Sequence, residues 1–273
     1  MSRLLQSLFC LLIPAAGWAQ QPIIPLPDPS SNTTVAVPQQ VRRAEPPPAT
    51  ASAQELEERG DTLKEAKLFA DGIDYYQAAL KKNGPPAPLH NKIGIAELQM
   101  LRYDAAKKEF ERALKSDKTY AEAFNNLGVA FYSKKSYRNA IRNYEKAIAL
   151  RGSSASFHSN LGTAYFARKE YERANHEYLR ALELDPDIFE HRGMNGVSLQ
   201  LISAEERARY NYTVAKMYAR VGNAERSLLY LRKALEDGYD KIDNVYKDAE
   251  FAALRKDPRF TQLMAAKPAA IPQ

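Results

Sequence analysis

The chain of 273 residues contains a single cysteine, Cys10, which excludes a framework of disulfide bonds and a cysteine-rich metal site. It also lacks a long block of one charge, because its 39 lysines and arginines are interspersed with 33 aspartates and glutamates. The resulting net charge of +6, without a basic run, does not indicate nucleic-acid binding.

Sequence motifs that would indicate catalysis are missing as well. The sequence has no H-E-x-x-H, no glycine-rich phosphate loop and no G-x-S-x-G. Adjacent acidic pairs such as Glu57-Glu58 are the ordinary charge of a solvated helix. We therefore expect a protein that is not an enzyme, with no catalytic residue, no cofactor and no metal.

The first nineteen residues have the layout of a secretory signal peptide. Arg3 is followed by an apolar stretch from Leu4 to Ile13, and the small residues Gly17 and Ala19 stand at the −3 and −1 positions of a cleavage site. The apolar stretch is short for a bilayer core of about 30 Å. We expect cleavage after Ala19, export to the periplasm or the outside of the cell, and no integral membrane segment in the mature chain. An uncleaved membrane anchor is the alternative.

The next segment, residues 20–52, contains 8 of the 16 prolines of the chain among Gln, Ser, Thr and Ala. No apolar periodicity of 2.0 or 3.6 residues runs through it. Because such a composition buries too little apolar surface to offset the entropy of ordering, we expect a disordered, extended linker.

A period of 34 residues fills most of the remaining chain. Glycines recur at this interval, and so do alanines and aromatic residues at fixed offsets from them. The three series are Gly60, Gly94, Gly128 and Gly162; Ala79, Ala113, Ala147 and Ala181; and Tyr76, Phe110, Tyr144 and Tyr178. A regular period of this length indicates a repeat architecture.

These residues resemble the tetratricopeptide repeat family, in which each repeat is a helix-turn-helix unit. The resemblance implies an all-α fold, an α-solenoid coiled as a right-handed superhelix. We expect four repeats over residues 53–188 (53–86, 87–120, 121–154 and 155–188). An insertion (189–207), a fifth, divergent repeat (208–241), and capping helices with a tail (242–273) then follow.

The resemblance also implies a concave groove that binds a protein or peptide. The candidate groove residues are Asn91, Asn125, Asn126, Tyr132, Asn160, Phe166, Arg209, Tyr212, Lys216 and Arg220. Side-chain amides pair with the backbone of an extended peptide, and aromatic rings offer apolar seats. The groove begins with the acidic residues Glu57 and Asp61 and ends with basic ones, so we expect it to orient a bound segment. The alternative is a merely solvated face.

The function expected from these features is a non-catalytic protein-interaction scaffold of a bacterial-type cell envelope. Two alternatives stay open. The first is an envelope assembly factor for a pilus or the outer membrane, acting through its convex face or through residues 189–207. The second is an enzyme subunit, which would need a site in that same insertion.

Overall fold

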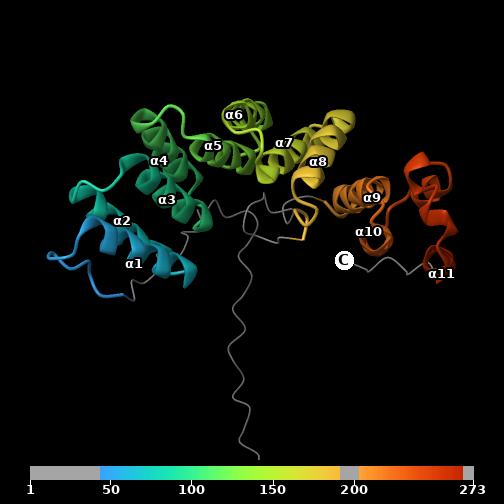
Figure 1. Ribbon diagram of the computed structural model, residues 1–273, viewed down its shortest axis with the longest axis horizontal. Coiled ribbons are helices and arrows are strands. Elements are labelled where there is room, and N and C mark those ends of the chain that lie inside the picture. Colours follow the sequence, from blue (N-terminus) through green and yellow to red (C-terminus); the bar gives the residue numbers. More distant parts are fainter. Residues whose placement is uncertain (1–43, 191–202, 267–273) are drawn as a thin grey trace, which may run out of the picture. The chain divides into compact units, whose positions relative to one another are not determined.

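The computed structural model describes residues 44–190 and 203–266, and all regular secondary structure in this part of the chain is helical, as predicted. The expected signal peptide, most of the expected linker and residues 191–202 of the expected insertion lie outside the described residues. Figure 1 shows the described helices as successive pairs in chain order. The fold is therefore the predicted α-solenoid, in which each pair packs on the next.

The first four helix pairs follow the four 34-residue units expected from the sequence, except that the first helix of the second pair begins at Pro86, one residue before its expected unit. Their bounds are α1 Ala53–Glu65, α2 Phe69–Lys81, α3 Pro86–Gln99, α4 Tyr103–Ser116, α5 Ala121–Ser133, α6 Tyr137–Leu150, α7 Ala155–Ala167 and α8 Tyr171–Leu184. Within each pair the two helices pack on each other, and the second helix also packs on the first helix of the next pair.

The repeated glycines and aromatics meet inside each pair. A Cβ atom added at Gly128 would lie only 2.5 Å from Cε1 of Tyr144, so the first helix approaches this ring as closely as a glycine allows. Tyr144 and its three equivalents, together with the repeated alanines such as Ala147, are 0% exposed. The residues that repeat every 34 positions are thus those at the contact between the two helices of each pair.

The turn inside each pair has the same backbone conformation. In all five pairs, the second residue after the first helix lies in the left-handed region. These residues are Lys67, Leu101, Lys135, Lys169 and Gly222, with φ angles of 61°, 60°, 57°, 63° and 80°. Only the fifth pair uses glycine, the residue that adopts this conformation without steric cost.

The fifth pair restarts the pattern after the interruption. α9 (Ala204–Arg220) begins at a capping box, in which Ser203 Oγ accepts from the backbone of Glu206, and α10 (Ala224–Glu236) follows. Residues 204–207, expected in the insertion, therefore belong to α9. The two helices are tied by Ser227 Oγ, which donates to the carbonyl of Ala215 at 2.9 Å.

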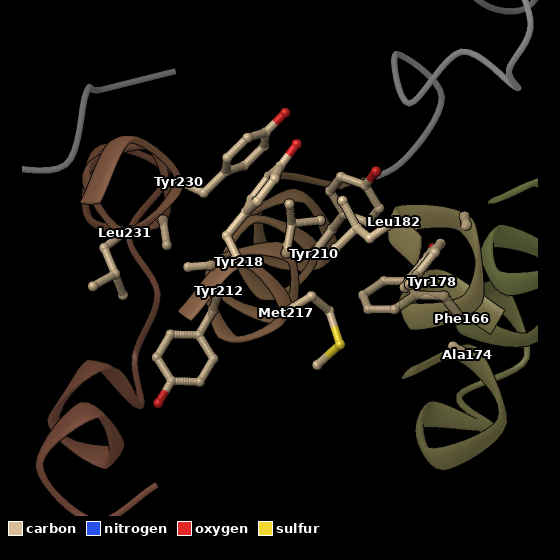
Figure 2. Packing of buried hydrophobic residues seen from close by; sticks show 14 of the residues in the cluster. Phe166, Ala174, Tyr178, Leu182, Tyr210, Tyr212, Met217, Tyr218, Tyr230 and Leu231 are labelled. Atoms are coloured by element: carbon tan, nitrogen blue, oxygen red, sulfur yellow. The ribbon is translucent and has the colours of Figure 1, made fainter. Parts of the chain in front are cut away.

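Aromatic rings join this fifth pair to α8. Tyr210 of α9 lies edge-on to Tyr178 of α8 with ring centroids 5.8 Å apart, and the ring centroid of Phe189 lies 5.5 Å from that of Tyr178. Figure 2 shows Tyr178, Tyr210, Tyr218 and Tyr230 within this cluster of buried side chains. Burial of these rings holds α9 against α8, although the two helices are separated in the sequence.

Short helices follow α10. They are η2 (Ile242–Tyr246), η3 (Ala249–Phe251), η4 (Leu254–Lys256) and α11 (Pro258–Ala266). Five of their apolar side chains are buried: Val245, Phe251, Leu254, Phe260 and Leu263. They cover the apolar face of the last pair, which has no following repeat to cover it.

At the other end, residues 44–52 pack along α2 before α1 begins. The backbone N–H of Ala44 donates to Asp71 Oδ1 at 2.9 Å, the Tyr75 hydroxyl donates to the carbonyl of Glu45 at 3.1 Å, and Lys82 Nζ donates to the carbonyl of Ala49 at 2.7 Å. The expectation of a disordered linker over all of 20–52 is thus corrected at its end, because side chains of α2 satisfy this extended backbone.

Candidate binding surface

The groove expected from the sequence involves one stripe of the first helix of each pair. This groove stripe consists of Gln54, Glu57, Asp61 and Lys64 on α1; Asn91, Ile95 and Leu98 on α3; Glu122, Asn125, Val129 and Tyr132 on α5; Ser156, Ser159, Thr163 and Phe166 on α7; and Arg209, Tyr212, Lys216 and Ala219 on α9. α3 contacts α5, and α5 contacts α7, so the stripes of these three helices are neighbours.

The asparagines of the stripe are linked by hydrogen bonds, in part through Asn126, which adjoins the stripe on α5. Asn160 Nδ2 donates to Asn125 Oδ1 at 2.9 Å, Asn125 Nδ2 donates to Asn126 Oδ1 at 3.1 Å, and Asn126 Nδ2 donates to Asn91 Oδ1 at 2.9 Å. Asn91, Asn125 and Asn160 are buried. This amide ladder joins α7 to α5 and α5 to α3. The expectation that these amides are free to pair with a peptide backbone is therefore corrected.

The acidic end of the stripe is neutralised by the second repeat. Lys92 Nζ lies 2.6 Å from both Glu57 Oε1 and Asp61 Oδ2, and the Tyr76 hydroxyl donates to Asp61 Oδ1 at 2.8 Å. Burial alone would raise the pKa of Asp61, but the hydrogen bonds from Lys92 and Tyr76 outweigh it and hold this pKa below its ordinary value. Asp61 is therefore a structural anion.

The basic end is neutralised by the segment that caps the last pair. Lys216 Nζ lies 3.0 Å from Asp248 Oδ2 and 3.5 Å from Glu250 Oε1. The Tyr212 hydroxyl donates to Asp248 Oδ2 at 2.9 Å, and its ring centroid lies 5.6 Å from that of Phe251. The expected basic groove end is thus occupied by η3 and the residues before it, because their side chains complement α9 in charge and shape.

The other two basic candidates differ from each other. Arg209 donates to the Tyr171 hydroxyl at 3.2 Å and to Glu205 Oε1 at 3.3 Å, so its charge is also paired within the chain. Arg220, at the end of α9, is exposed. The stripe therefore lacks the unpaired acidic and basic ends that its sequence suggested.

The other two aromatic candidates, besides Tyr212, are core residues. Tyr132 and Phe166 are each 6% exposed. Tyr132 packs on Tyr137, with centroids 5.2 Å apart, and Phe166 packs on Tyr171 and Tyr210 at 5.4 and 5.8 Å. The expectation of apolar seats at these positions is corrected, because the second helix of each pair and α9 already cover the rings.

The groove stripe nevertheless retains apolar side chains that are only half-buried. Ile95 and Leu98 of α3 and Val129 of α5 are intermediate in exposure. Ile95 and Val129 occupy equivalent positions on two helices in contact. These aliphatic residues are not among the candidates chosen from the sequence, which are polar or aromatic, although an aliphatic residue in a solvent-facing stripe is a readable signal.

A second concavity lies elsewhere, between α10, α11 and the residues that follow α8. It has a volume of about 1030 Å³. Leu229, 41% exposed, and Arg232 line it from α10, and Glu190 lines it from the start of the interruption. Arg226 in its wall pairs with Asp187. No sequence pattern indicated this cleft, because it forms from three segments far apart in the chain.

Side chains of catalytic or metal-binding type have structural partners. His90 Nδ1 lies 2.7 Å from Glu109 Oε2, and His158 Nδ1 lies 2.7 Å from Glu177 Oε2, each joining the two helices of one pair. Over the described ranges, no group of three or more His, Cys, Asp and Glu side chains has an arrangement that would hold a metal ion. Nor is any helix within those ranges long and apolar enough to span a membrane.

Models of one repeat family match the middle of the chain. A TPR repeat model matches residues 130–167, and two tetratricopeptide repeat models match residues 155–188 and 91–141. With the paired helices described above, these matches identify tetratricopeptide repeats within residues 91–188. No curated protein matches the chain.

Solved structures with a similar fold include three repeat proteins. TTC0263, a thermophilic TPR protein from Thermus thermophilus, is 17% identical, with 78% of this chain and 99% of that one covered at a TM-score of 0.48. MamA from Desulfovibrio magneticus RS-1 is also 17% identical, with 67% and 93% covered and the same TM-score. YrrB, described as a TPR protein with an unusual peptide-binding site, is 19% identical, with 71% and 91% covered at 0.45.

Proposed function

We propose that this solenoid of tetratricopeptide repeats is a non-catalytic protein-interaction scaffold that binds a partner segment on the groove stripe of α3 and α5. The observation that supports it is the row of half-buried aliphatic side chains at Ile95, Leu98 and Val129. On α9, the same stripe is covered by Asp248, Glu250 and Phe251 of the chain itself. A protein partner would supply that cover in the middle of the solenoid.

The proposed place of action is the cell envelope, as an exported periplasmic or secreted protein. The layout of residues 1–19, with Arg3 before an apolar stretch and Ala19 before the cleavage site, supports this proposal. Cleavage there removes Cys10 and leaves a chain without cysteine, which is compatible with an oxidising compartment.

The cleft beside α10 favours a second candidate, the envelope assembly factor. Glu190 places the start of the expected insertion in its wall, and Leu229 exposes apolar surface there. A partner held at this cleft would contact the solenoid away from the groove stripe.

Affinity capture from an envelope extract separates these candidates. We expect Val129→Asp to lose partners that the unaltered chain captures, while Leu229→Asp and the control Leu150→Asp, at another exposed apolar site, retain them. Loss of capture in Leu229→Asp alone would favour the assembly factor. Equal capture by all variants would contradict both binding surfaces, and turnover of a substrate by the purified chain would identify an enzyme.

A further inference from the structure

We infer that exposed cations on and beside α4 and α6 form a basic surface that binds the anionic phospholipid headgroups of a bilayer. α4 and α6 are second helices of their pairs, so this surface is separate from the groove stripe, which lies on the first helices. Binding there goes beyond the proposed function. The inference follows from where the positive charge of the chain is concentrated and from which cations lack an acidic partner.

The net positive charge of the chain is carried by one part of the solenoid. Residues 101–151 contain 12 lysines and arginines but only 6 aspartates and glutamates. The rest of the sequence has 27 residues of each kind, so this segment accounts for the whole net charge of +6. It consists of α4, α5 and α6 with the turns beside them.

The acidic residues of this segment are already bonded within the chain. Four of the six form ion pairs: Asp104 with Lys134, Glu109 with Arg112, Glu111 with Lys107, and Glu122 with Arg151. The other two, Asp117 and Glu145, accept from the hydroxyls of Thr119 and Tyr165. Among the described residues, six exposed cations of the segment then have neither an ion pair nor an aromatic ring as partner: Lys108, Lys115, Lys118, Lys135, Arg138 and Arg142.

The fold brings these cations of different helices together. Lys108 of α4 and Arg142 of α6 stand at equivalent positions of successive repeats, and Arg138 lies one helical turn before Arg142 on the same face. α4 and α6 both pack on α5. The beginnings of the two helices are joined by Lys134, whose Nζ lies 2.5 Å from Asp104 Oδ1. The unpaired cations therefore form one surface across two helices.

The neighbouring second helices do not continue this surface. At the position of Arg142, α8 carries His176 and α2 carries Asp74. The two arginines of α8 are exposed but paired with carboxylates: Arg173 with Glu170 and Arg180 with Glu183. The surplus of unpaired cations is thus confined to α4, α6 and the residues beside them.

A bilayer surface fits this arrangement better than an acidic protein segment does. The cations are spread over two helices and their flanking residues, so the ligand must present anions over a broad area. Lipid headgroups are mobile and adapt to such spacing, whereas an acidic protein needs carboxylates at matching fixed positions. The guanidinium groups of Arg138 and Arg142 suit phosphate, because each can donate two parallel hydrogen bonds to it. Each cation near an anionic leaflet strengthens binding by about fivefold.

The test is flotation of the purified full chain with lipid vesicles. Vesicles of phosphatidylcholine with about 30% phosphatidylglycerol should bind the chain at least about tenfold more tightly than vesicles of phosphatidylcholine alone. The neutral vesicles also measure any binding through the apolar stretch Leu4 to Ile13. Raising the salt from about 0.05 M to about 0.5 M should weaken binding to the anionic vesicles by at least about tenfold.

Two double variants with the same change in net charge locate the binding surface. Arg138→Gln with Arg142→Gln should weaken binding to the anionic vesicles by about twentyfold, because both cations are unpaired. The matched control, Arg173→Gln with Arg180→Gln, removes two paired cations of α8 and should weaken it by less than about threefold. Unchanged urea midpoints of both double variants exclude unfolding as the cause of any loss.

Equal affinity for neutral and anionic vesicles would overturn the inference, and so would an equal loss in the two double variants. Binding of polyglutamate, but not of vesicles, that is lost with Arg138 and Arg142 would assign the surface to an acidic protein and overturn it as well. A concentration-dependent dimer abolished by the same change would assign the surface to a second copy. The capture experiment with the Val129→Asp variant tests the groove stripe separately, so either proposal can fail without the other.

Discussion

The hydroxyl of Tyr178 donates a hydrogen bond to Oγ1 of Thr163, 15 residues earlier, at 3.3 Å. Tyr76 makes the equivalent bond to Asp61 at 2.8 Å. In the third pair, the residue at the position of Thr163 is Val129, which has no acceptor. The Tyr144 hydroxyl is fully buried and has no hydrogen-bond partner among the described residues.

This difference predicts opposite effects of the same substitution. Tyr144→Phe removes an unsatisfied buried hydroxyl and should raise the free energy of unfolding by about 1 kcal/mol. Tyr178→Phe removes a bonded hydroxyl and should lower it by about 1 kcal/mol. Urea unfolding followed by circular dichroism measures both, and a loss of stability in both variants would show that Tyr144 has a partner after all.

The amide ladder predicts that replacing its most buried member, Asn160, destabilises the fold. Asn160 is 1% exposed, and Asn160→Leu would leave Asn125 Oδ1 without its donor. We expect the free energy of unfolding to fall by about 1–3 kcal/mol. The exposed Gln99→Leu should change it by no more than about 0.5 kcal/mol. Equal urea midpoints for the two variants would show that the ladder contributes nothing to stability.

Because the turn residues adopt left-handed backbone conformations, we expect the chain to be more stable with glycine than with lysine at one of these positions. Lys135 has φ 57°, and Lys135→Gly should raise the free energy of unfolding by about 0.5–1 kcal/mol. Gly222→Ala should lower it by about 1 kcal/mol through backbone strain alone, because nothing lies within 4 Å of a Cβ there. A lower thermal midpoint for Lys135→Gly would indicate that the lysine side chain itself stabilises the turn.

The buried tyrosines predict weak stability in alkali. Burial raises the pKa of Tyr144 and Tyr210 well above 10.0, and raises that of Tyr218 to about 12. Since these groups lose their protons near pH 10 only when the chain unfolds, stability is fully present below about pH 10 and falls above it. Above about pH 10, each of these tyrosines lowers the free energy of unfolding by about 1.4 kcal/mol per pH unit.

Urea midpoints between about pH 8 and pH 11, recorded with tyrosinate absorbance, check this expectation. The midpoint should fall above about pH 10, and most of the absorbance change should accompany unfolding. A constant midpoint with tyrosinate forming in the folded chain would contradict the burial of these hydroxyls.

The expected signal peptide predicts the first residue of the mature protein. If residues 1–19 are a signal peptide, the intact mass of material from the envelope should correspond to a chain beginning at Gln20. Replacing Ala19 by a bulky residue such as Leu should block or shift the cleavage. Retention of Arg3 in the exported protein would support the membrane anchor instead.

The helix pairs and their core could be predicted from the amino-acid sequence alone. Gly128, Tyr144 and Ala147 could be assigned to a packed contact because residue size and apolarity repeat every 34 positions, and each repeat buries the same face. This information is local, since a residue's own type encodes whether it packs closely or fills space. The fifth, divergent repeat could be predicted for the same reason, although its first helix begins at Ala204 and not at residue 208.

Which polar groups remain available, by contrast, depends on the arrangement of the repeats in space. Asn125 reads as a binding residue until Asn160 is seen to bond it, and Lys216 reads as a free cation until Asp248 lies 3.0 Å away. A polar side chain offers the same atoms to a neighbouring repeat, a capping segment or a partner. Which one takes them depends on the position of the donor and acceptor in space, and this is set by how successive repeats stack.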